Sequence, residues 1–479
     1  MKIKVALPLL VAILVLSGCV NSKNTSNGDT KNESSNQSSS ISLSDSSTSE
    51  NSEKYRDYEE KEIEAPLEPL MSGGQSIYAI PVTYKKASFL HDSTTFDKDL
   101  AMLSFGLCSS SGRRTFTEAF YQSLDFDEII LNDAYSIKPT QDSVAYAIAH
   151  RVVAGYDLVA VSFRSNNYFN EWANNFELGS TGNHQGFERT SMIAFNDLDN
   201  YLKNNNYNNQ NTKVWITGYS RGGALANMLA SEIMTSKSLL IKEENLFVYT
   251  FEAPRAFSKA NAINFPNVHN IINSADIVQR FAPEQYGLFR AGKEYDTYSP
   301  DVQEYLNEFD SNLVLPELNV DGLPYSNDQE HVEFILDNLL VDEDYEDEHG
   351  FNPYAPTRED FATKYQSAIV NAVNFYFSLS ENTKANIQSA FSKLDLIGYL
   401  SLMAEDGFYN FIKPYFDADG VEYDDALLRA TCNRLLSFVI GPGAGILGEA
   451  MSYSSNLQRM IYFHTFEVNY VLLKNFEVK

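Results

Sequence analysis

Cysteine and positive charge are scarce in this chain of 479 residues. It has three cysteines, and its 36 lysines and arginines are outnumbered by 64 aspartates and glutamates, which gives a formal net charge of −28. Such an excess disfavours nucleic acid or an anionic membrane surface as the main partner, and it is typical of a solvated acidic surface. Three cysteines are too few for a disulfide framework. Cys108 and Cys432 either pair or stay as buried thiols, and the sequence does not decide between the two.

Long apolar runs are missing too, apart from a short one at the N-terminus. A basic start precedes the apolar run 5–16, which is shorter than the ~20 residues of a membrane-spanning helix and indicates a signal peptide over 1–18. The run ends in Leu16-Ser17-Gly18-Cys19, which resembles the bacterial lipobox. This resemblance implies cleavage before Cys19 and a lipid on that cysteine. We therefore expect an extracytoplasmic lipoprotein anchored to the membrane by two or more acyl chains, with an ordinary secreted protein as the alternative.

The composition divides the chain into segments. Residues 19–60 are rich in Ser, Asn and acidic side chains and have few large apolar groups, so we expect a disordered tether. Residues 61–325 carry the patterns of a folded core. Residues 326–459 indicate a mostly helical insertion or cap with acidic loops, and residues 460–479 are expected to return to the core.

Strand and helix patterns alternate within the predicted core. The expected strands are 76–84, 126–131, 156–163, 213–218, 246–251 and 268–273, and the expected helices are 97–107, 143–153, 187–202 and 221–234. Short buried strands that alternate with helices imply a mainly parallel sheet covered on both faces, which is an α/β fold.

Two further patterns do not indicate a cofactor. Residues 443–448 match G-x-G-x-x-G, but the chain after them is too short for a dinucleotide-binding fold. The acidic run 342–349, which ends in His349, is typical of a solvated loop, with a divalent-ion site as the alternative. We expect neither a metal nor an organic cofactor.

The strongest chemical signal surrounds Ser220. Gly218-Tyr219-Ser220-Arg221-Gly222 matches G-x-S-x-G, with a buried strand before it and a helix of small residues after it. A sharp strand-to-helix turn needs glycines because side chains beside the serine would clash. The serine oxygen would then lie at a helix N-terminus, where amide groups favour an oxyanion. This context predicts that Ser220 is a nucleophile, and a merely structural turn is the alternative.

The motif and its surroundings resemble the class 3 lipases, the α/β-hydrolase family that includes the fungal triacylglycerol lipases, and especially their bacterial relatives. Four other stretches are similar to the family segments F-R-G-[ST], W-x-x-N, H-x-G-F and Y-T-F-G-x-P-R. They are Phe163-Arg164-Ser165-Asn166, Glu171-Trp172-Ala173-Asn174-Asn175, His184-Gln185-Gly186-Phe187 and Tyr249-Thr250-Phe251-Glu252-Ala253-Pro254-Arg255. The resemblance implies an α/β-hydrolase with a mainly parallel sheet, a helical insertion near the C-terminus, and cleavage of carboxylic esters, lipid esters among them.

The resemblance also implies an acid and an oxyanion hole. Asp276 follows a buried strand within a stretch similar to D-x-V-P-x-x-P, although Gln279 replaces a proline, and a carboxyl end of a strand is where open α/β sheets place their sites. We expect Asp276 to orient the catalytic histidine. The expected oxyanion donors are the amide of Arg221 and Asn166, where Ser165 and Asn166 both depart from the family residues.

The catalytic histidine is expected after Asp276, because the order in this fold is Ser, acid, His. Of the seven histidines, that leaves His331, His349 and His464. His464 lies in a C-terminal stretch that resembles the H-x-P-E-x-Y segment of the bacterial relatives, with Phe466 in place of proline. It is the predicted base, and His331 at the start of an insertion helix is the alternative.

These residues predict a serine esterase or lipase that works by two-step acyl transfer. Two other classes stay open. One is a serine hydrolase of thioesters, amides or cell-wall esters. The other is a non-catalytic surface lipoprotein that keeps the fold for binding, which the departures at Ser165 and Asn166 favour.

Overall fold

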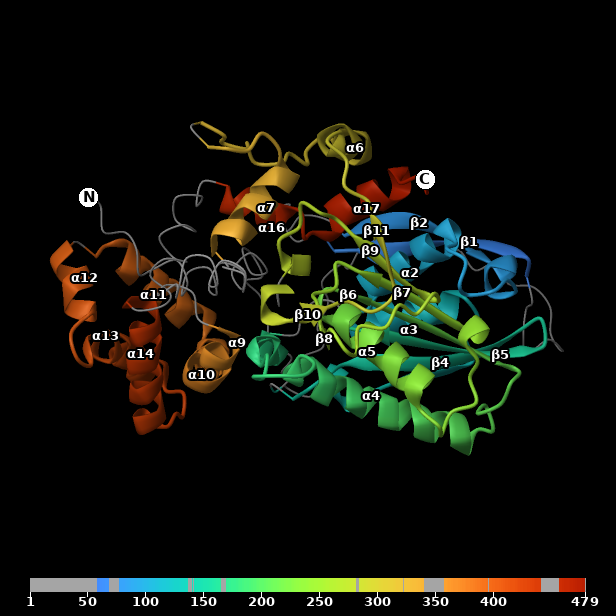
Figure 1. Cartoon of the computed structure of the whole chain (residues 1–479), viewed down its shortest axis with the longest axis horizontal. Helices are drawn as coiled ribbons and strands as arrows, with labels where there is room; N and C mark the ends of the chain where they lie inside the picture. Colours follow the sequence, from blue (N-terminus) through green and yellow to red (C-terminus); the bar gives the residue numbers. More distant parts are fainter. Residues whose placement is uncertain are drawn as a thin grey trace, which may run out of the picture.

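A seven-stranded sheet forms the centre of the molecule (Figure 1). The computed structural model describes residues 58–68, 77–136, 140, 142–164, 169–280, 284–321, 323–339, 357–394, 396–440 and 456–478. The strand order is β11-β9-β7-β6-β5-β4-β3. Neighbours from β5 to β11 run parallel, whereas β4 pairs antiparallel with both β3 and β5. The strands are β3 (Glu128–Leu131), β4 (Tyr146–Val153), β5 (Tyr156–Phe163), β6 (Thr212–Tyr219), β7 (Leu246–Phe251), β9 (Val268–Ile272) and β11 (Lys293–Asp296).

The sheet confirms the predicted fold class, an α/β-hydrolase with a mainly parallel sheet, and corrects one predicted element. Residues 143–153 were expected to form a helix that stops at Gly155, but they contain strand β4. Ala154 and Gly155, with φ of 50° and 82°, make a two-residue hairpin turn into β5, and two positive φ angles in succession are typical of the tightest hairpins. Alternating alanines favoured the helix, and β4 is covered on both faces, so no polar alternation marked it as a strand.

Helices cover both faces of the sheet. On β6, Val214 and Ile216 face α4 (Gln185–Asn204) and α5 (Arg221–Thr235). Trp215 and Tyr219 face the opposite layer, which contains α2 (Lys98–Ser110) and α17 (Phe466–Asn475). Because successive strand residues point to opposite faces, one fully buried strand contributes to both apolar layers.

The second layer includes a hairpin outside the central sheet. β2 (Tyr78–Lys85) corresponds to the predicted strand 76–84, whereas β1 (Glu60–Leu67), with which it pairs antiparallel, was not predicted. The hairpin packs against α2. The layer also contains α3 (Arg114–Ser123), α6 (Val302–Phe309) and the short α16 (Leu457–Tyr462). Small pairings and 3-10 turns complete the core; they are β8 (Phe257–Ser258), β10 (Leu288–Phe289), η1 (Lys86–Phe89), η2 (Asp133–Tyr135), η3 (Phe169–Phe176), η4 (Glu243–Asn245), η5 (Val278–Arg280) and η6 (Glu284–Tyr286).

The described part of residues 326–459 contains helices and no strand. Figure 1 shows most of these helices gathered at one end of the molecule. They are α7 (Asp328–Leu339), α9 (Arg358–Asp360), the π-helical turn η7 (Phe361–Tyr365), α10 (Gln366–Ser378), α11 (Glu381–Ser392), α12 (Leu396–Leu402), α13 (Gly407–Asp419) and α14 (Asp425–Ile440). α11, α13 and α14 share an apolar cluster around Phe391 and Phe416, so this group has a core separate from the sheet.

Arg358 ties these helices to a loop of the α/β core. Its guanidinium donates hydrogen bonds to the carbonyl oxygens of Leu178 at 2.7 Å, Gly179 at 2.8 Å, Gly182 at 3.0 Å and Asn183 at 3.1 Å. A planar group with five N–H donors can satisfy several carbonyls at once, which an ammonium cannot do in this geometry.

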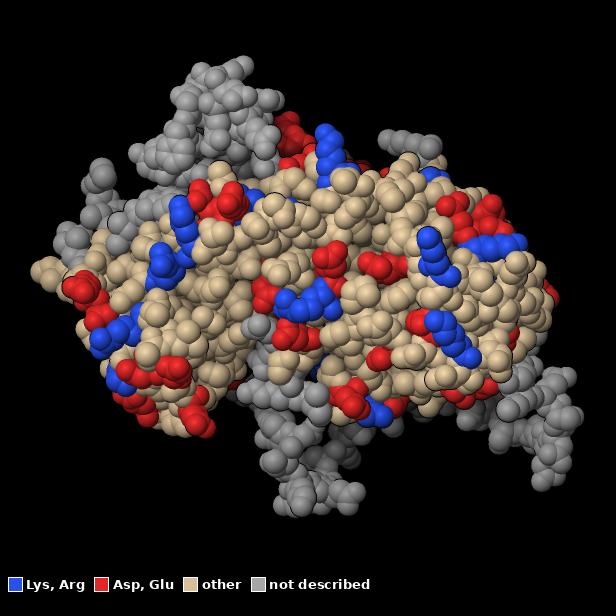
Figure 2. All heavy atoms as spheres, turned by 60° about the horizontal axis from the view of Figure 1, so that its bottom comes forward, with Lys and Arg blue, Asp and Glu red and all other residues tan. Residues whose placement is uncertain are grey.

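Acidic and basic side chains are interspersed over the face seen in Figure 2, with uncharged areas between them. Within the described ranges, no helix is both long enough and apolar enough to cross a membrane. Cys108 and Cys432 are both buried and form no disulfide with each other. Burial raises the pKa of each thiol to about 12, so neither is a reactive thiolate near neutral pH.

Candidate active site

Ser220 occupies a sharp turn between β6 and α5. Its backbone lies at φ 54° and ψ −127°, a region that residues with a side chain enter at a cost of about 1–3 kcal/mol. The Ser220 N–H donates to the carbonyl oxygen of Phe251 at 2.8 Å, which fixes the turn to the neighbouring strand β7. The serine therefore sits at the carboxyl edge of the sheet, where sites of this fold class are built.

The glycines around Ser220 make the turn possible. A Cβ on Gly218 would lie 2.1 Å from the carbonyl oxygen of Gly222, far inside van der Waals contact. A Cβ on Gly223 would lie 2.9 Å from the Cβ of Ala253. The spacing that suggested a nucleophile in the sequence is thus a steric requirement of the strand-to-helix turn.

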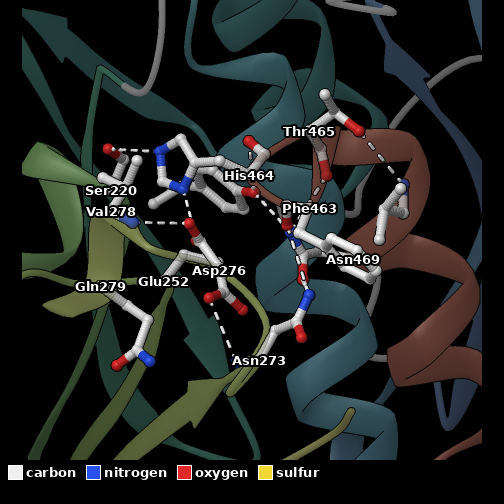
Figure 3. A network of polar contacts seen from close by, with 12 residues as sticks. Ser220, Glu252, Asn273, Asp276, Val278, Gln279, Phe463, His464, Thr465 and Asn469 are labelled. Atoms are coloured by element: carbon white, nitrogen blue, oxygen red, sulfur yellow. Dashed lines mark hydrogen bonds and ion pairs between the residues drawn. The ribbon is translucent and has the colours of Figure 1, made fainter. Parts of the chain in front are cut away.

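Three of the predicted residues meet at this turn (Figure 3). The Ser220 Oγ lies 2.8 Å from Nε2 of His464, and Nδ1 of the same ring lies 2.5 Å from Oδ2 of Asp276. These partners select the neutral tautomer in which Nδ1 carries the proton and Nε2 accepts one from the serine hydroxyl. The Asp276 side chain is fully buried, whereas that of His464 is 16% exposed, so the imidazole edge faces outward.

Asp276 is held by the chain just beyond β9. Its Oδ1 accepts a hydrogen bond from the Val278 N–H at 2.7 Å. Its own N–H donates to the carbonyl oxygen of Asn273 at 2.8 Å. With one oxygen fixed by the backbone, the other stays aimed at the imidazole.

His464 lies between α16 and α17 and is positioned by polar groups that the sequence did not single out. The Tyr219 hydroxyl donates to the carbonyl oxygen of His464 at 3.1 Å. The Asn469 side-chain amide donates to the Tyr219 hydroxyl at 2.8 Å and to the carbonyl oxygen of Phe463 at 2.8 Å. Asn469 is buried on α17, and it is the one polar residue in the run from Val468 to Leu473, which is the signal that could have identified it from the sequence.

One of the two predicted oxyanion donors can be described. Arg221 is the first residue of α5, so its amide belongs to the N-terminal turn, whose N–H groups have no partner within the helix. Its buried side chain turns away into a network in which Nη1 lies 3.2 Å from Glu171 and Nε donates to Asn174 at 3.0 Å. Glu171 also binds Arg164. The other predicted donor, Asn166, lies outside the described residues, as do Ser165 and Cys19.

The remaining histidine candidates are placed differently. His331, on α7, is buried, and its ring stacks on Tyr325 with centroids 4.4 Å apart. His349 lies outside the described residues. His184 caps α4 by accepting from the Phe187 N–H, and its Nε2 lies 3.0 Å from the carbonyl oxygen of Asn175. The stretches 184–187 and 171–175, which resemble H-x-G-F and W-x-x-N, therefore contact each other through His184, and His184 does not contact Ser220.

A second carboxyl beside Asp276 also escaped the sequence reasoning. Glu252 follows β7 directly and is 1% exposed. Figure 3 shows its carboxyl next to that of Asp276, whose charge is one of the causes that raise the pKa of Glu252. The signal was visible as Glu252 in the place where the resembling family segment has glycine.

Among the described residues, no three side chains of histidine, cysteine, aspartate or glutamate lie close enough together to hold a metal ion. The groups around Ser220 are a hydroxyl, an imidazole and a carboxylate in hydrogen-bond series, the set that nucleophilic acyl transfer uses.

Comparison with known proteins relates this site to an enzyme family. Residues 159–286 match the family model described as Lipase (class 3). A search of curated proteins gave no match. The matched segment contains Ser220 and Asp276, whereas His464 lies beyond it.

Among solved structures, the chain is similar to the native lipase propeptide complex of Rhizomucor miehei, at 22% identity over 41% of this chain and 67% of that one, with a TM-score of 0.32. A lipase from Rhizopus microsporus var. chinensis is 17% identical over 41% and 73%, with a TM-score of 0.31. A triacylglycerol lipase whose catalytic centre is a serine protease triad is 19% identical over 50% and 94%, with a TM-score of 0.34. At these low values, the structures add no argument about the site, whose chemistry follows from its own geometry.

A strained serine at a strand-to-helix turn, next to a histidine backed by a buried aspartate, defines a hydrolase of the α/β class. The family match indicates which bond this hydrolase cleaves. The chain is a carboxylic ester hydrolase, and the comparisons support the class 3 lipase family.

Proposed function

We propose that this protein hydrolyses lipid esters with Ser220 as nucleophile, His464 as general base and Asp276 as the acid that orients the histidine. The observation that carries the proposal is the series of contacts from the Ser220 Oγ to His464 at 2.8 Å and from His464 to Asp276 at 2.5 Å. Both lengths lie within hydrogen-bond reach, so the proton can move without rearrangement of the backbone.

The reaction has two acyl-transfer steps. In the first, Nε2 of His464 takes the hydroxyl proton as the Ser220 Oγ attacks the ester carbonyl, and the same proton then passes to the departing alcohol. In the second, His464 takes a proton from water as the water oxygen attacks the acyl-enzyme carbonyl, and it then gives that proton to the Ser220 Oγ as the bond to the acyl group breaks and the acid leaves. Asp276 stabilises the imidazolium in both steps, because its buried carboxylate lies against Nδ1.

Each tetrahedral intermediate carries a negative oxygen that needs donors. The Arg221 amide at the start of α5 suits that role, because helix N-termini favour negative charge. Asn166 is the second donor in this proposal. The side chain of Arg221, held by Glu171 and Asn174, fixes the amide in place.

The proposal is tested with an ester panel and a serine-directed phosphonate. We expect the wild-type protein to cleave aryl esters and triacylglycerols, and the phosphonate to label it once. Ser220→Ala should lose both labelling and turnover, the latter by roughly 10⁴- to 10⁶-fold, while its circular dichroism stays unchanged. A folded Ser220→Ala protein with near-normal turnover would contradict the mechanism. Cleavage of thioesters or amides alone would contradict the substrate class.

We also propose that the enzyme acts on the outer side of a membrane to which lipid on Cys19 attaches it. The sequence Leu16-Ser17-Gly18-Cys19 and the net charge of −28 support this proposal. A chain of that charge is repelled by anionic lipid surfaces, so a stable attachment needs the free energy of buried acyl chains.

A further inference from the structure

Glu252 is held in a backbone conformation that does not favour glutamate. Its φ is +47°, in the left-handed region, where a residue with a Cβ costs about 1–2 kcal/mol relative to ordinary backbone. Its N–H donates to the carbonyl oxygen of Ile271 at 3.0 Å, so the conformation is tied to β9. Glycine would avoid this strain, which indicates that the side chain itself does something.

The carboxyl of Glu252 has two recognisable partners. Oε2 accepts a hydrogen bond from the Asn273 N–H at 3.1 Å. Its second neighbour is the carboxyl of Asp276, beside which it lies in Figure 3. Both side chains are buried, and two ionised carboxylates side by side without water repel each other strongly, so the pair favours a state in which one of them carries a proton.

The surroundings decide which carboxyl is protonated. Both oxygens of Asp276 already face hydrogen-bond donors, because Oδ1 accepts from the Val278 N–H and Oδ2 lies against the Nδ1 proton of His464. Glu252 is buried, and burial together with the neighbouring charge of Asp276 raises the pKa of its carboxyl well above the usual value. The proton therefore resides on Glu252.

We propose that Glu252 is a positioning residue of the triad: in its protonated form it donates a hydrogen bond to the Asp276 carboxylate and holds it against His464. The bond fixes the carboxylate from the side opposite the imidazole. It also keeps a second negative charge away from the histidine that must gain and lose a proton in each turnover. This role rests on the proposed function of Asp276.

Other charged groups around Glu252 also affect whether its carboxyl is protonated. Arg290, fully buried and bound to the Gln279 carbonyl oxygen at 2.9 Å, favours ionisation of Glu252 but does not outweigh burial and Asp276. Tyr219, on β6, has its own pKa raised well above the usual value, mainly by burial and further by the acidic groups around it, Asp276 among them. At alkaline pH, ionisation of Glu252 would remove the donor and add a charge, so turnover should fall.

Two substitutions distinguish the hydrogen bond that Glu252 donates from the negative charge that it would carry when ionised. Glu252→Gln keeps a donor for Asp276 and an acceptor for the Asn273 N–H but cannot ionise, so we expect turnover within about threefold of wild type and no alkaline fall due to this group. Glu252→Ala removes the donor, and kcat should drop on the order of tenfold with KM unchanged, since a hydrogen bond to a charged group is lost.

Glu177→Gln is the matched control, because Glu177 is also a mostly buried carboxyl but pairs with Arg189 at 2.5 Å, away from Asp276. Its pH profile should equal that of wild type. The proposal is overturned if the profile of Glu252→Gln keeps the wild-type alkaline fall. It is equally overturned if Glu252→Gln drops to the background of Ser220→Ala, because the charge of Glu252 would then be what matters.

Difference infrared spectroscopy gives a readout that needs no activity. Wild type minus Glu252→Gln at neutral pH should show the carbonyl stretch of one protonated carboxyl. Absence of that band overturns the proposal even if Glu252→Ala fails to fold. An inactive wild-type protein that still shows the band would count against the proposed function and leave the protonation of Glu252 established.

Discussion

At the scale of single residues, a histidine acts as a base only where its partners allow it to exchange a proton. Nδ1 of His464 contacts Asp276, and its other nitrogen contacts the Ser220 hydroxyl. His331 is stacked on Tyr325, and burial lowers its pKa to about 4. The sequence predicted His464 and kept His331 as the alternative, because the order of the triad along the chain does not reveal which one reaches the sheet.

This difference predicts the outcome of a histidine series. His464→Ala should lower turnover of a soluble ester on the order of 10⁴-fold, close to the Ser220→Ala background. His331→Ala should keep turnover but lose about 0.5–3 kcal/mol of unfolding free energy, because a buried ring is removed. His349→Ala should change neither. Kinetics and urea unfolding of the three variants check this, and loss of turnover in His331→Ala would move the base into the insertion.

At the scale of elements, the residues around the site were the most predictable part of the chain. β5, β6 and β7 are short runs of buried apolar residues, and α5 begins directly after Ser220. Their pattern is local, so the sequence alone predicted them. The prediction for β4 was wrong because both of its faces are covered: Ala147 and Ala149 pack in one apolar layer and Tyr146 and Ile148 in the other, so no alternation of polar residues marked a strand. Glu252 and Asn469 were missed because each has a partner near the site that is distant along the chain: Asn273 lies 21 positions from Glu252, and Tyr219 lies 250 positions from Asn469.

The hydrogen bonds of Arg358 predict how firmly the helical segment is attached. Arg358→Lys cannot reach the carbonyls of Leu178, Gly179 and Asn183 together, so we expect a loss of about 1–3 kcal/mol of unfolding free energy. Amide hydrogen exchange over 178–183 should speed up. Arg429→Lys is the control, since Arg429 is a largely exposed residue that pairs with Asp406 at 3.5 Å, and it should be nearly neutral. Equal exchange in the two variants would contradict the role of Arg358.

At the scale of the whole molecule, buried neutral histidines couple stability to pH. Burial lowers the pKa of His184 to about 3 and of His269 and His331 to about 4. The unfolded chain takes up these protons below about pH 6.5, whereas the folded protein does not until near pH 4 or below. The contribution to stability is therefore complete above about pH 6.5 and is lost as the pH falls.

Each such histidine should contribute a slope of about 1.4 kcal/mol per pH unit within that window. Urea unfolding at pH 7 and pH 5 measures the slope. His269→Gln can keep a hydrogen bond to the Ser93 carbonyl oxygen but cannot take up a proton. It should therefore reduce the slope by the contribution of one histidine, about 1.4 kcal/mol per pH unit. An unchanged slope in that variant would mean that His269 is charged in the folded protein.

Attachment to a membrane is also a property of the whole molecule, and here the sequence supplies the only argument. Cys19→Ser should move the protein from the membrane fraction to the soluble fraction and leave ester hydrolysis intact, because the cysteine is far from Ser220 in the chain. Fractionation followed by immunoblotting and an ester assay checks both. A variant that stays fully bound would show that another anchor exists.

Because the nucleophile and the base are far apart along the chain, the active site is completed only late in synthesis. Ser220 and His464 meet across 244 positions, so during synthesis the strand, turn and helix that carry the serine emerge long before the residues that activate it. Until α17 docks beside α2 and α6, the serine is an ordinary alcohol with no imidazole to take its proton. On the proposed route of export, the enzyme would thus be inert while it crosses the membrane and would become reactive only on the outer side.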